Sequence, residues 1–249
     1  MKRFLIYSLL LLVSFSASAS ITHWEAGNKA YIEGNYEKAI EEYTAIVEGG
    51  EYSVELYYNL ANAHFKQGEI GKSILYYNKA LRIAPSQEDV RHNLAIAEAK
   101  TKDRITAIPE FFLNRWMRTV RNSASCIAWS VLSIVAFGLL LAFALLFLLA
   151  SNIKWRKAGF YLALFSAVLF VATLLFALSA RNDMLVRDEA VVMASAMSVK
   201  SSPDNSATDL FILHEGTKVR ILSEVDEWRE VVIADGKKGW TLKSNIEEI

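Results

Sequence analysis

Two long runs of apolar residues without a charged side chain constrain this sequence more than any other feature. Residues 126–150 and 158–180 form runs of 25 and 23 residues that contain no Asp, Glu, Lys, Arg or His. At a rise of 1.5 Å per residue, a helix of either length crosses a hydrocarbon layer about 30 Å thick. Hydrophobic residues make up 53% of the chain, more than a soluble domain normally carries. The sequence therefore predicts a membrane protein with two transmembrane helices.

The connection between these runs predicts their orientation. Residues 151–157 are too few for more than a tight turn, and they include Lys154, Arg156 and Lys157. Basic residues in short loops favour the cytoplasmic side of a membrane. We therefore expect a cytoplasmic turn, with the segments before and after the hairpin together on the opposite side.

The N-terminus has the pattern of an export signal. Lys2 and Arg3 precede an apolar run at residues 4–13, and Ala17-Ser18-Ala19 follows as a small-residue cleavage site. We interpret residues 1–19 as a signal peptide that precedes a mature chain beginning at Ser20. The alternative is an uncleaved anchor, but the run is shorter than the roughly 20 residues that span a bilayer.

A repeat with a period of 34 residues follows the signal. Gly34 matches Gly68, Ile40 matches Ile74, Tyr43 matches Tyr77, and Gly27 matches Ala61. Small residues at fixed positions and Pro85 at the end of the second unit resemble the tetratricopeptide repeat, a pair of antiparallel helices. The resemblance predicts an α-helical repeat domain over residues 20–105, with two repeats and one extra helix.

In this family the first helix of each repeat lines a concave groove that binds peptides. The resemblance places six partner-binding residues on that face: Trp24, Asn28, Tyr31, Tyr58, Asn62 and Phe65. Amide and aromatic groups suit an extended peptide, which needs hydrogen bonds for its backbone and pockets for its side chains. The alternative for each residue is packing between the repeats.

A basic amphipathic segment leads into the first apolar run. In the linker 106–125, a helix would gather Phe112, Trp116 and other apolar residues on one face. The other face carries Arg115, Arg118 and Arg121. This pattern is typical of a helix that lies at a membrane interface with its arginines near lipid phosphates. The alternative is an ordinary helix packed against the repeats.

The C-terminal region changes to a β pattern. Short runs rich in Val and Ile alternate with turns from Asp188 onward, and Asp235-Gly236 is a hairpin signal. Residues 188–249 resemble a bacterial SH3-like domain, a small all-β barrel. The resemblance makes Phe211, Trp228 and Trp240 candidates for a binding surface, and their alternative role is core packing.

The sequence offers little for catalysis or for a cofactor. Its four histidines are scattered without metal-ligand spacing, and no glycine-rich phosphate loop is present. The net charge of zero and the single Cys126 argue against a nucleic-acid partner and against a disulfide framework. The apolar runs hold no ionisable group of the kind that transporters use. We expect no enzyme activity, no catalytic or metal-binding residue and no cofactor.

The order of these segments resembles the BatE-like proteins of the aerotolerance (Bat) family of bacterial envelope proteins. The resemblance implies an inner-membrane protein whose two soluble domains are periplasmic. It implies partners among other Bat proteins, including those with von Willebrand A-type domains, and a role in oxidative-stress tolerance. We therefore expect a scaffold or adaptor that contacts proteins and membrane lipid. The alternative is a cell-wall-associated protein that binds peptidoglycan through its SH3-like domain.

Overall fold

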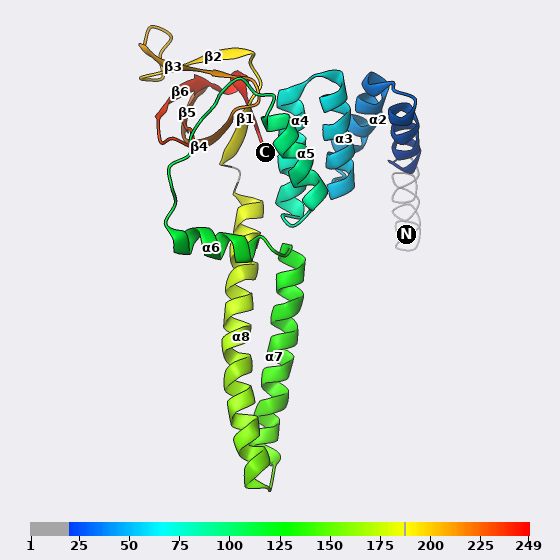
Figure 1. Cartoon of the computed structure of the whole chain (residues 1–249), viewed down its shortest axis with the longest axis vertical. Helices are drawn as coiled ribbons and strands as arrows, with labels where there is room; N and C mark the ends of the chain where they lie inside the picture. The colour runs from blue at the N-terminus through cyan, green and yellow to red at the C-terminus, as the bar shows by residue number, and fades with distance from the viewer. Residues whose placement is uncertain (1–19, 187) are drawn as a thin grey trace, which may run out of the picture. The chain divides into compact units, whose positions relative to one another are not determined.

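The computed structural model describes residues 20–186 and 188–249, and the expected signal peptide at residues 1–19 lies outside this part of the chain. The chain divides into two compact units (Figure 1). The first unit combines the repeat helices, residues 88–108 and the whole C-terminal region from Asp188. The second unit holds residues 82–87 and 109–187. The repeats and the β region therefore belong to the same compact unit.

Antiparallel helices build the repeat region. A helix over residues 20–32 is followed by α2 (Tyr36–Glu48), α3 (Val54–Gln67), α4 (Ile70–Ile83) and α5 (Glu88–Glu98). Local caps define the helix ends: the side chain of Ser53 accepts a hydrogen bond from the backbone N–H of Leu56, and Gly68 ends α3 with a φ of 90°. Only glycine adopts this left-handed conformation without strain, which explains why Gly recurs at this point of each repeat.

Large side chains fill the core between these helices. Tyr43, Leu60, Ile74 and Tyr77 are all almost completely buried. The helix over residues 20–32 comes so close to α2 that a methyl group at Gly27 would lie 2.6 Å from the ring of Tyr43. The small residue at Gly27 is therefore required by the aromatic side chain that packs on it.

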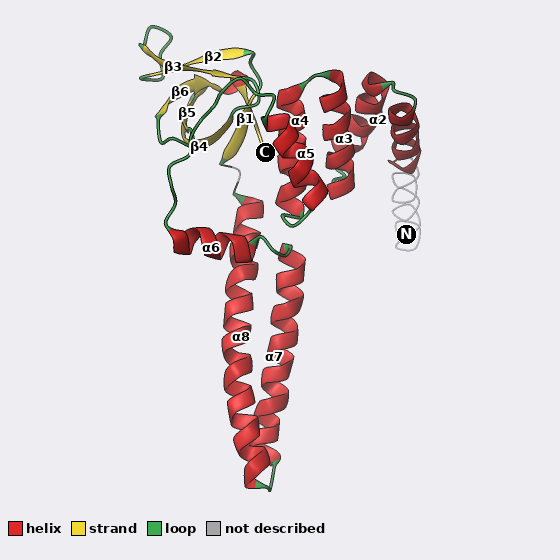
Figure 2. Ribbon diagram, in the orientation of Figure 1, coloured by secondary structure: helices red, strands yellow, loops and turns green. Residues whose placement is uncertain are grey.

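The C-terminal region is a seven-stranded antiparallel sheet (Figure 2). Its strands are β1 (Glu189–Val192), β2 (Ala196–Lys200), β3 (Asp209–His214), β4 (Lys218–Val225), β5 (Trp228–Val232), β6 (Lys238–Leu242) and β7 (Ile246–Glu248). Their order across the sheet is β3-β2-β6-β5-β4-β1-β7. The predicted turn at Asp235-Gly236 joins β5 to β6, where Gly236 has a φ of 87°. The sequence pattern did not indicate β2 or β7.

Two long helices form the hairpin of the second unit. They are α7 (Cys126–Leu149) and α8 (Ile153–Leu185), and both are long and apolar enough to cross a membrane. The connection is shorter than the expected turn at residues 151–157, because the side chain of Asn152 caps α8 and residues 153–157 are helical. The helix α8 also extends beyond the expected run at 158–180, through the polar residues up to Leu185.

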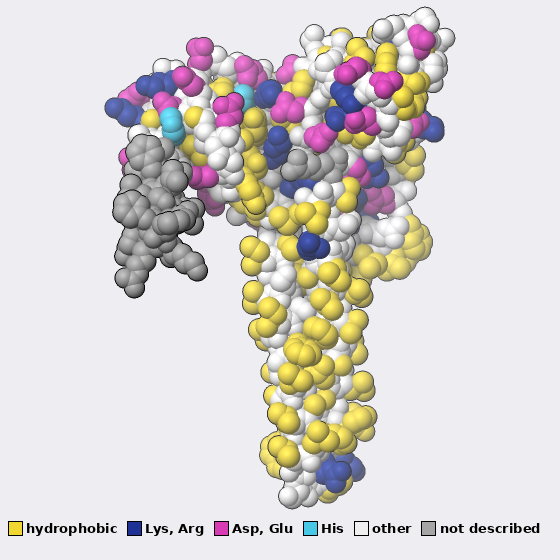
Figure 3. All heavy atoms as spheres, turned by 180° about the vertical axis from the view of Figure 1, so that it is seen from behind, with side chains coloured by type: hydrophobic (Ala, Val, Ile, Leu, Met, Phe, Trp, Pro, Cys, Tyr) yellow, Lys and Arg dark blue, Asp and Glu magenta, His cyan; other side chains and the backbone are white. Residues whose placement is uncertain are grey.

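Small residues let α7 and α8 approach closely. A methyl group added to Gly159 would lie 2.7 Å from the backbone nitrogen of Phe147, so the two helix backbones nearly touch there. Ser133, Ser166 and Thr173 are buried in the same unit. Because small side chains increase backbone contact, this arrangement is typical of helix pairs in membranes. Figure 3 shows hydrophobic side chains covering the length of the hairpin, with basic ones at its turn.

Candidate interaction surfaces

A repeated set of hydrogen bonds joins the helices of the repeat region. The Tyr43 hydroxyl donates to the side-chain oxygen of Asn28 over 2.7 Å, and Asn59 donates to the same oxygen over 3.2 Å. One repeat later, Tyr77 and Asn93 both donate to the side-chain oxygen of Asn62. We call these two sets the Tyr–Asn ladder. Each member has its counterpart 34 residues along the chain, so the ladder has the period of the sequence repeat.

Burial raises the pKa of the tyrosines in the ladder above the ordinary value of 10.0. It raises the pKa of Tyr43 to about 12, although the hydrogen bond with Asn59 works in the opposite direction. Burial also raises the pKa of Tyr77. An apolar surrounding disfavours the charged phenolate, so both hydroxyls remain hydrogen-bond donors at any physiological pH. The ladder is therefore an uncharged network.

The two asparagines of the predicted groove thus have a structural role. Their side-chain oxygens accept hydrogen bonds from buried tyrosines, and a buried hydroxyl without a partner would be costly. Among the described residues, however, the side-chain nitrogens of Asn28 and Asn62 have no hydrogen-bond partner. Asn62 is half-buried rather than fully enclosed. The side-chain oxygen of each asparagine therefore stabilises the fold, and the side-chain nitrogen remains available to donate a hydrogen bond to a ligand.

The aromatic residues predicted for the groove are half-buried and pack on one another. Trp24 lies 5.8 Å from the ring of Tyr43, and Tyr58 lies 6.1 Å from that of Tyr77, measured between ring centroids. All four predicted groove aromatics contact the core of the repeats: Trp24, Tyr31, Tyr58 and Phe65. Each of these side chains is partly packed and partly exposed. Packing between the repeats therefore does not exclude contact with a partner.

The β region covers α4 of the repeats through polar contacts. Lys72 pairs with Glu247 at 2.5 Å, and the backbone N–H of Gly71 donates to the carboxylate of Glu215 over 2.7 Å. The ammonium of Lys218 also donates to the side-chain oxygen of Asn78 over 3.3 Å. Asn78 belongs to α4 and precedes Lys218 by 140 residues. These contacts use residues from β7, from the turn after β3 and from β4. The face of α4 that they occupy is therefore closed to other partners.

Apolar residues of the sheet complete this interface. Val191 and Ile249 are buried in the same hydrophobic cluster as Ile74 and Tyr77 of the repeats. The remaining core of the sheet, with Val199 and Val231 among its members, forms a cluster of its own. The first unit therefore has two cores, and one of them is shared between the repeats and the sheet.

The segment after α5 is fastened to the sheet. Asp103 accepts hydrogen bonds from the backbone N–H of His214 and from the hydroxyl of Thr217, over 2.7 and 2.6 Å, and its other oxygen lies 2.7 Å from the His214 ring. Burial alone would raise the pKa of Asp103, but these hydrogen bonds outweigh it and hold the pKa below its usual value. Ile105 packs on the sheet core. Sequence reasoning assigned this segment to the end of the repeat domain and missed its contacts with the sheet.

The three aromatic residues proposed for the sheet surface lie on different faces. Side chains alternate between the faces of a strand, and residues paired across strands share a face. Phe211 pairs with the buried Val199 and packs on the sheet core. Trp240 pairs with Glu230, two positions from Trp228 on β5, so the two tryptophans are diagonal neighbours on the opposite face. The structure therefore brings Trp228 and Trp240 together and separates Phe211 from them.

The basic segment before the hairpin is helical, as the sequence predicted. It forms α6 (Phe112–Arg121), and its apolar side chains are exposed, with Phe112 at 73% and Trp116 at 59%. Figure 1 shows α6 running crosswise to the hairpin of the same unit. The indole N–H of Trp129, in the first turn of α7, donates to the backbone oxygen of Arg121 over 2.8 Å. The helix is thus held at the end of the apolar hairpin.

The three arginines of α6 differ in their partners. Arg121 pairs with Asp183 at 2.7 Å and donates to the hydroxyl of Ser179, so it holds α6 against α8. Arg118 pairs with the exposed Glu110 at 2.6 Å. Arg115 has no ion pair among the described residues. The expectation that all three side chains meet lipid phosphate therefore needs correction for Arg121, whose charge is engaged within the protein.

Comparison with known proteins supports the helical-repeat assignment. Residues 54–87 match the family model of the tetratricopeptide repeat. The match covers α3, α4 and the turn that follows, and so confirms the second predicted repeat. Comparison with curated proteins gave no match. Among the described residues, no group of three or more potential metal ligands lies close together.

Proposed function

We propose that this protein is a membrane-anchored scaffold whose repeats bind an extended segment of a partner protein. The tetratricopeptide repeat supports a role in protein–protein interaction. The two apolar helices support anchoring. The proposal is for a binding protein rather than an enzyme, because the sequence contains no recognisable catalytic constellation.

One observation carries the binding proposal. The Tyr–Asn ladder uses the side-chain oxygens of Asn28 and Asn62 and leaves both side-chain nitrogens without a partner among the described residues. These donors recur at the 34-residue period of the repeat. An extended peptide presents backbone carbonyl groups that accept hydrogen bonds of this kind, and half-buried aromatics beside them accommodate its side chains.

Photo-crosslinking in intact membranes tests this proposal. A photoreactive phenylalanine analogue replaces Phe65 in the full chain, and we expect it to crosslink to a discrete partner. The Asn28→Asp and Asn62→Asp variants keep the acceptor oxygen for the tyrosine but lose the free N–H donor, so they should weaken the crosslink. A probe at the exposed Glu41 of α2 is the control. Equal crosslinking from both positions would contradict a specific groove.

We also propose that both soluble regions lie outside the cytoplasm and that the turn between α7 and α8 lies inside. The export pattern at residues 1–19 and the basic turn support this orientation. With Cys126 replaced, single cysteines at Asn35 and Asp204 should react with a membrane-impermeant thiol reagent once the outer barrier is opened. A cysteine at Asn152 should not react. Labelling of only one of the first two positions would contradict the two-span arrangement.

The resemblance to BatE-like proteins suggests a biological setting. We propose that the scaffold works in the bacterial inner membrane within a Bat-type envelope complex related to aerotolerance. Its partners would then be membrane proteins with von Willebrand A-type domains. Crosslinking followed by partner identification tests this setting separately from the groove, because a different partner would refute the complex without refuting the binding site.

A second candidate function is binding to peptidoglycan through an SH3-like C-terminal region. The diagonal pair Trp228 and Trp240 on one face of the sheet favours it, since aromatic rings stack on sugar units. The full chain in non-ionic detergent should then sediment with intact sacculi, and a Trp228→Ala variant should sediment less. The isolated residues 188–249 are unsuitable for this test, because Val191 and Ile249 are buried against the repeats.

A further inference from the structure

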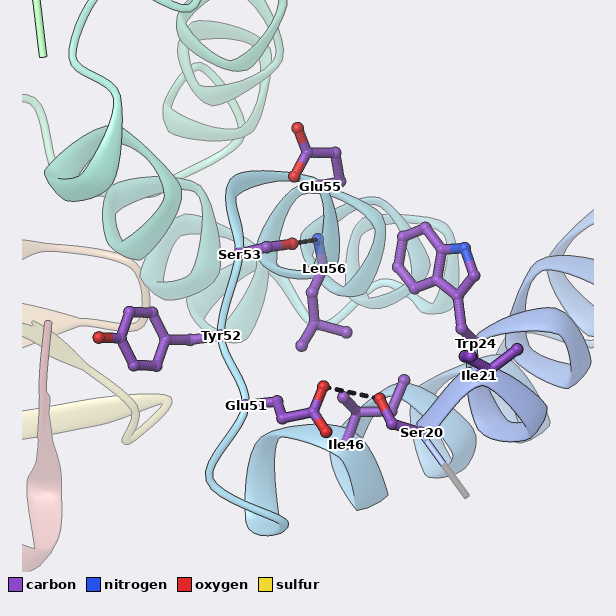
Figure 4. A pocket seen from close by; sticks show the side chains of 9 residues that line it. All are labelled: Ser20, Ile21, Trp24, Ile46, Glu51, Tyr52, Ser53, Glu55 and Leu56. Carbon is purple, nitrogen blue, oxygen red and sulfur yellow. Dashed lines mark hydrogen bonds between the residues drawn. The ribbon is translucent and has the colours of Figure 1, made fainter. Parts of the chain in front are cut away.

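A cleft opens at the N-terminal edge of the repeats, beside the start of α3 (Figure 4). Its volume is about 320 Å³, and its walls come from Ile21, Trp24, Ile46 and Leu56. Figure 4 shows Leu56 pointing into the space between Trp24 and the carboxylate of Glu51. The cleft is therefore apolar on several sides and has two acidic residues, Glu51 and Glu55, in its lining.

Glu51 is the acidic residue of the cleft that contacts Ser20. Its carboxylate accepts a hydrogen bond of 2.7 Å from the Ser20 hydroxyl, and no Lys, Arg or His side chain of the described residues pairs with it. Glu55, which also lines the cleft, lacks an ion pair within the same part of the chain. A carboxylate offers about four lone-pair positions, so the single bond from Ser20 leaves room for a further donor. The cleft therefore offers a negatively charged hydrogen-bond acceptor to a ligand.

The first repeat around the cleft also carries an excess of negative charge, which favours a positively charged ligand. Residues 20–60 carry eight glutamates and two lysines, with no Asp or Arg. Such an excess of one sign attracts oppositely charged groups and repels anions. The whole chain has zero net charge, so this negative surface is a local feature of the first repeat.

We propose that the cleft binds a Lys or Arg side chain of a partner protein, flanked there by apolar residues. The aliphatic stem of the side chain packs on Leu56 and Trp24, and its charged end reaches the carboxylate of Glu51. Long basic side chains combine an apolar stem with a charged tip, which matches the two kinds of surface in the cleft. The Trp24 ring adds a face to which a cation is attracted. This inference rests on the proposed function and specifies the chemistry of the partner.

Fluorine NMR of the full chain in non-ionic detergent tests the site. The protein carries 5-fluorotryptophan, and the resonance that disappears in a Trp24→Phe variant identifies Trp24. The probe is the peptide acetyl-Leu-Lys-Leu-amide, with norleucine or glutamate in place of lysine as comparison peptides. We expect a saturable shift of the Trp24 resonance with the lysine peptide and a much weaker response to the other two.

Two charge variants separate the cleft from general attraction. Glu51→Gln should raise the dissociation constant of the lysine peptide about tenfold, because it removes a charge-assisted hydrogen bond. Glu41→Gln changes the net charge equally on the exposed side of α2 and should leave the constant unchanged. An equal effect of both variants, equal binding of the norleucine peptide, or no saturable shift would each overturn the proposal.

The outcome is independent of the groove experiment. Crosslinking from Phe65 without a response of Trp24 to the lysine peptide would overturn the basic-side-chain site and leave the scaffold function standing. A response of Trp24 without crosslinking from Phe65 would support the cleft and count against the groove.

Discussion

The hydroxyl of Tyr77 donates a hydrogen bond to the side-chain oxygen of Asn62, and the same bond joins Tyr43 to Asn28 one repeat earlier. Both tyrosines are buried, so each asparagine provides the acceptor that a buried hydroxyl requires. Each asparagine that we predict to face a binding groove therefore also stabilises the pair of helices it belongs to.

This relationship gives a first prediction, for Asn62→Leu. The substitution removes the acceptor of the Tyr77 hydroxyl, and we expect the free energy of unfolding to fall by about 1–3 kcal/mol. The double variant Asn62→Leu/Tyr77→Phe removes both partners and should recover part of that loss. Chemical unfolding of the full chain in detergent measures both. No recovery in the double variant would mean that the hydrogen bond is not the source of the loss.

A second prediction concerns the pH dependence of the Asp103 cluster. Its hydrogen bonds lower the pKa of Asp103 below the usual 3.8, so the unfolded state binds protons more readily than the folded state. The resulting stability is complete above about pH 4 and is lost as pH falls through the lower folded pKa. We expect Asp103→Asn to destabilise the protein at neutral pH by about 1–3 kcal/mol. The difference from wild type should shrink in strong acid.

Unfolding measured between pH 2 and pH 7 checks this dependence. Thr217→Val removes one hydrogen bond to the same carboxylate and should show a smaller loss with the same trend. A difference between Asp103→Asn and wild type that is independent of pH would show that the carboxylate charge is not responsible.

A third prediction compares two glycines of the hairpin. Gly159→Ala would place a methyl group 2.7 Å from the Phe147 backbone, whereas nothing lies within 4 Å of a methyl group at Gly138. Both substitutions gain the same helix propensity, so their difference reports packing alone. We expect Gly159→Ala to be less stable than Gly138→Ala by about 1–3 kcal/mol. Thermal unfolding in detergent measures this difference, and equal stabilities would refute the close approach.

A fourth prediction concerns α6 and the lipid surface. A peptide of residues 107–123 should become helical on anionic vesicles, because it joins an apolar face to basic side chains. Replacing Arg115 or Arg118 with Gln should weaken its binding by about 1 kcal/mol each. Titration with vesicles of different charge measures the effect. Equal affinity for neutral and anionic vesicles would remove the electrostatic part of this model.

A fifth prediction assigns Arg121 to a different task. Its ion pair with Asp183 joins α6 to α8, so Arg121→Asp should lower the melting temperature of the full chain in detergent. The exchange variant Arg121→Asp/Asp183→Arg restores an opposite-charge pair and should recover part of the loss. A double variant no more stable than Arg121→Asp would argue against this pair.

Patterns that repeat along the chain were readable without the structure. The charge-free runs indicated two helices that could span a membrane, because hydropathy and length are local properties. The period of 34 residues indicated helical repeats, since each unit carries its own small and aromatic residues. Short runs rich in Val and Ile indicated strands, and Asp235-Gly236 indicated a turn. Each of these features depends on residues close together in sequence.

The tertiary structure decided what distant residues do to one another. The side-chain oxygen of Asn62 accepts a hydrogen bond from a tyrosine of the next helix, and Asp103 joins the end of the predicted repeat domain to a strand 111 residues away. Val191 and Ile249 are buried in the core of the repeats rather than in that of their own sheet. The physical reason is that side-chain partners are selected by packing in space. A pattern along the chain tells which face of an element is apolar, but not which other element covers that face.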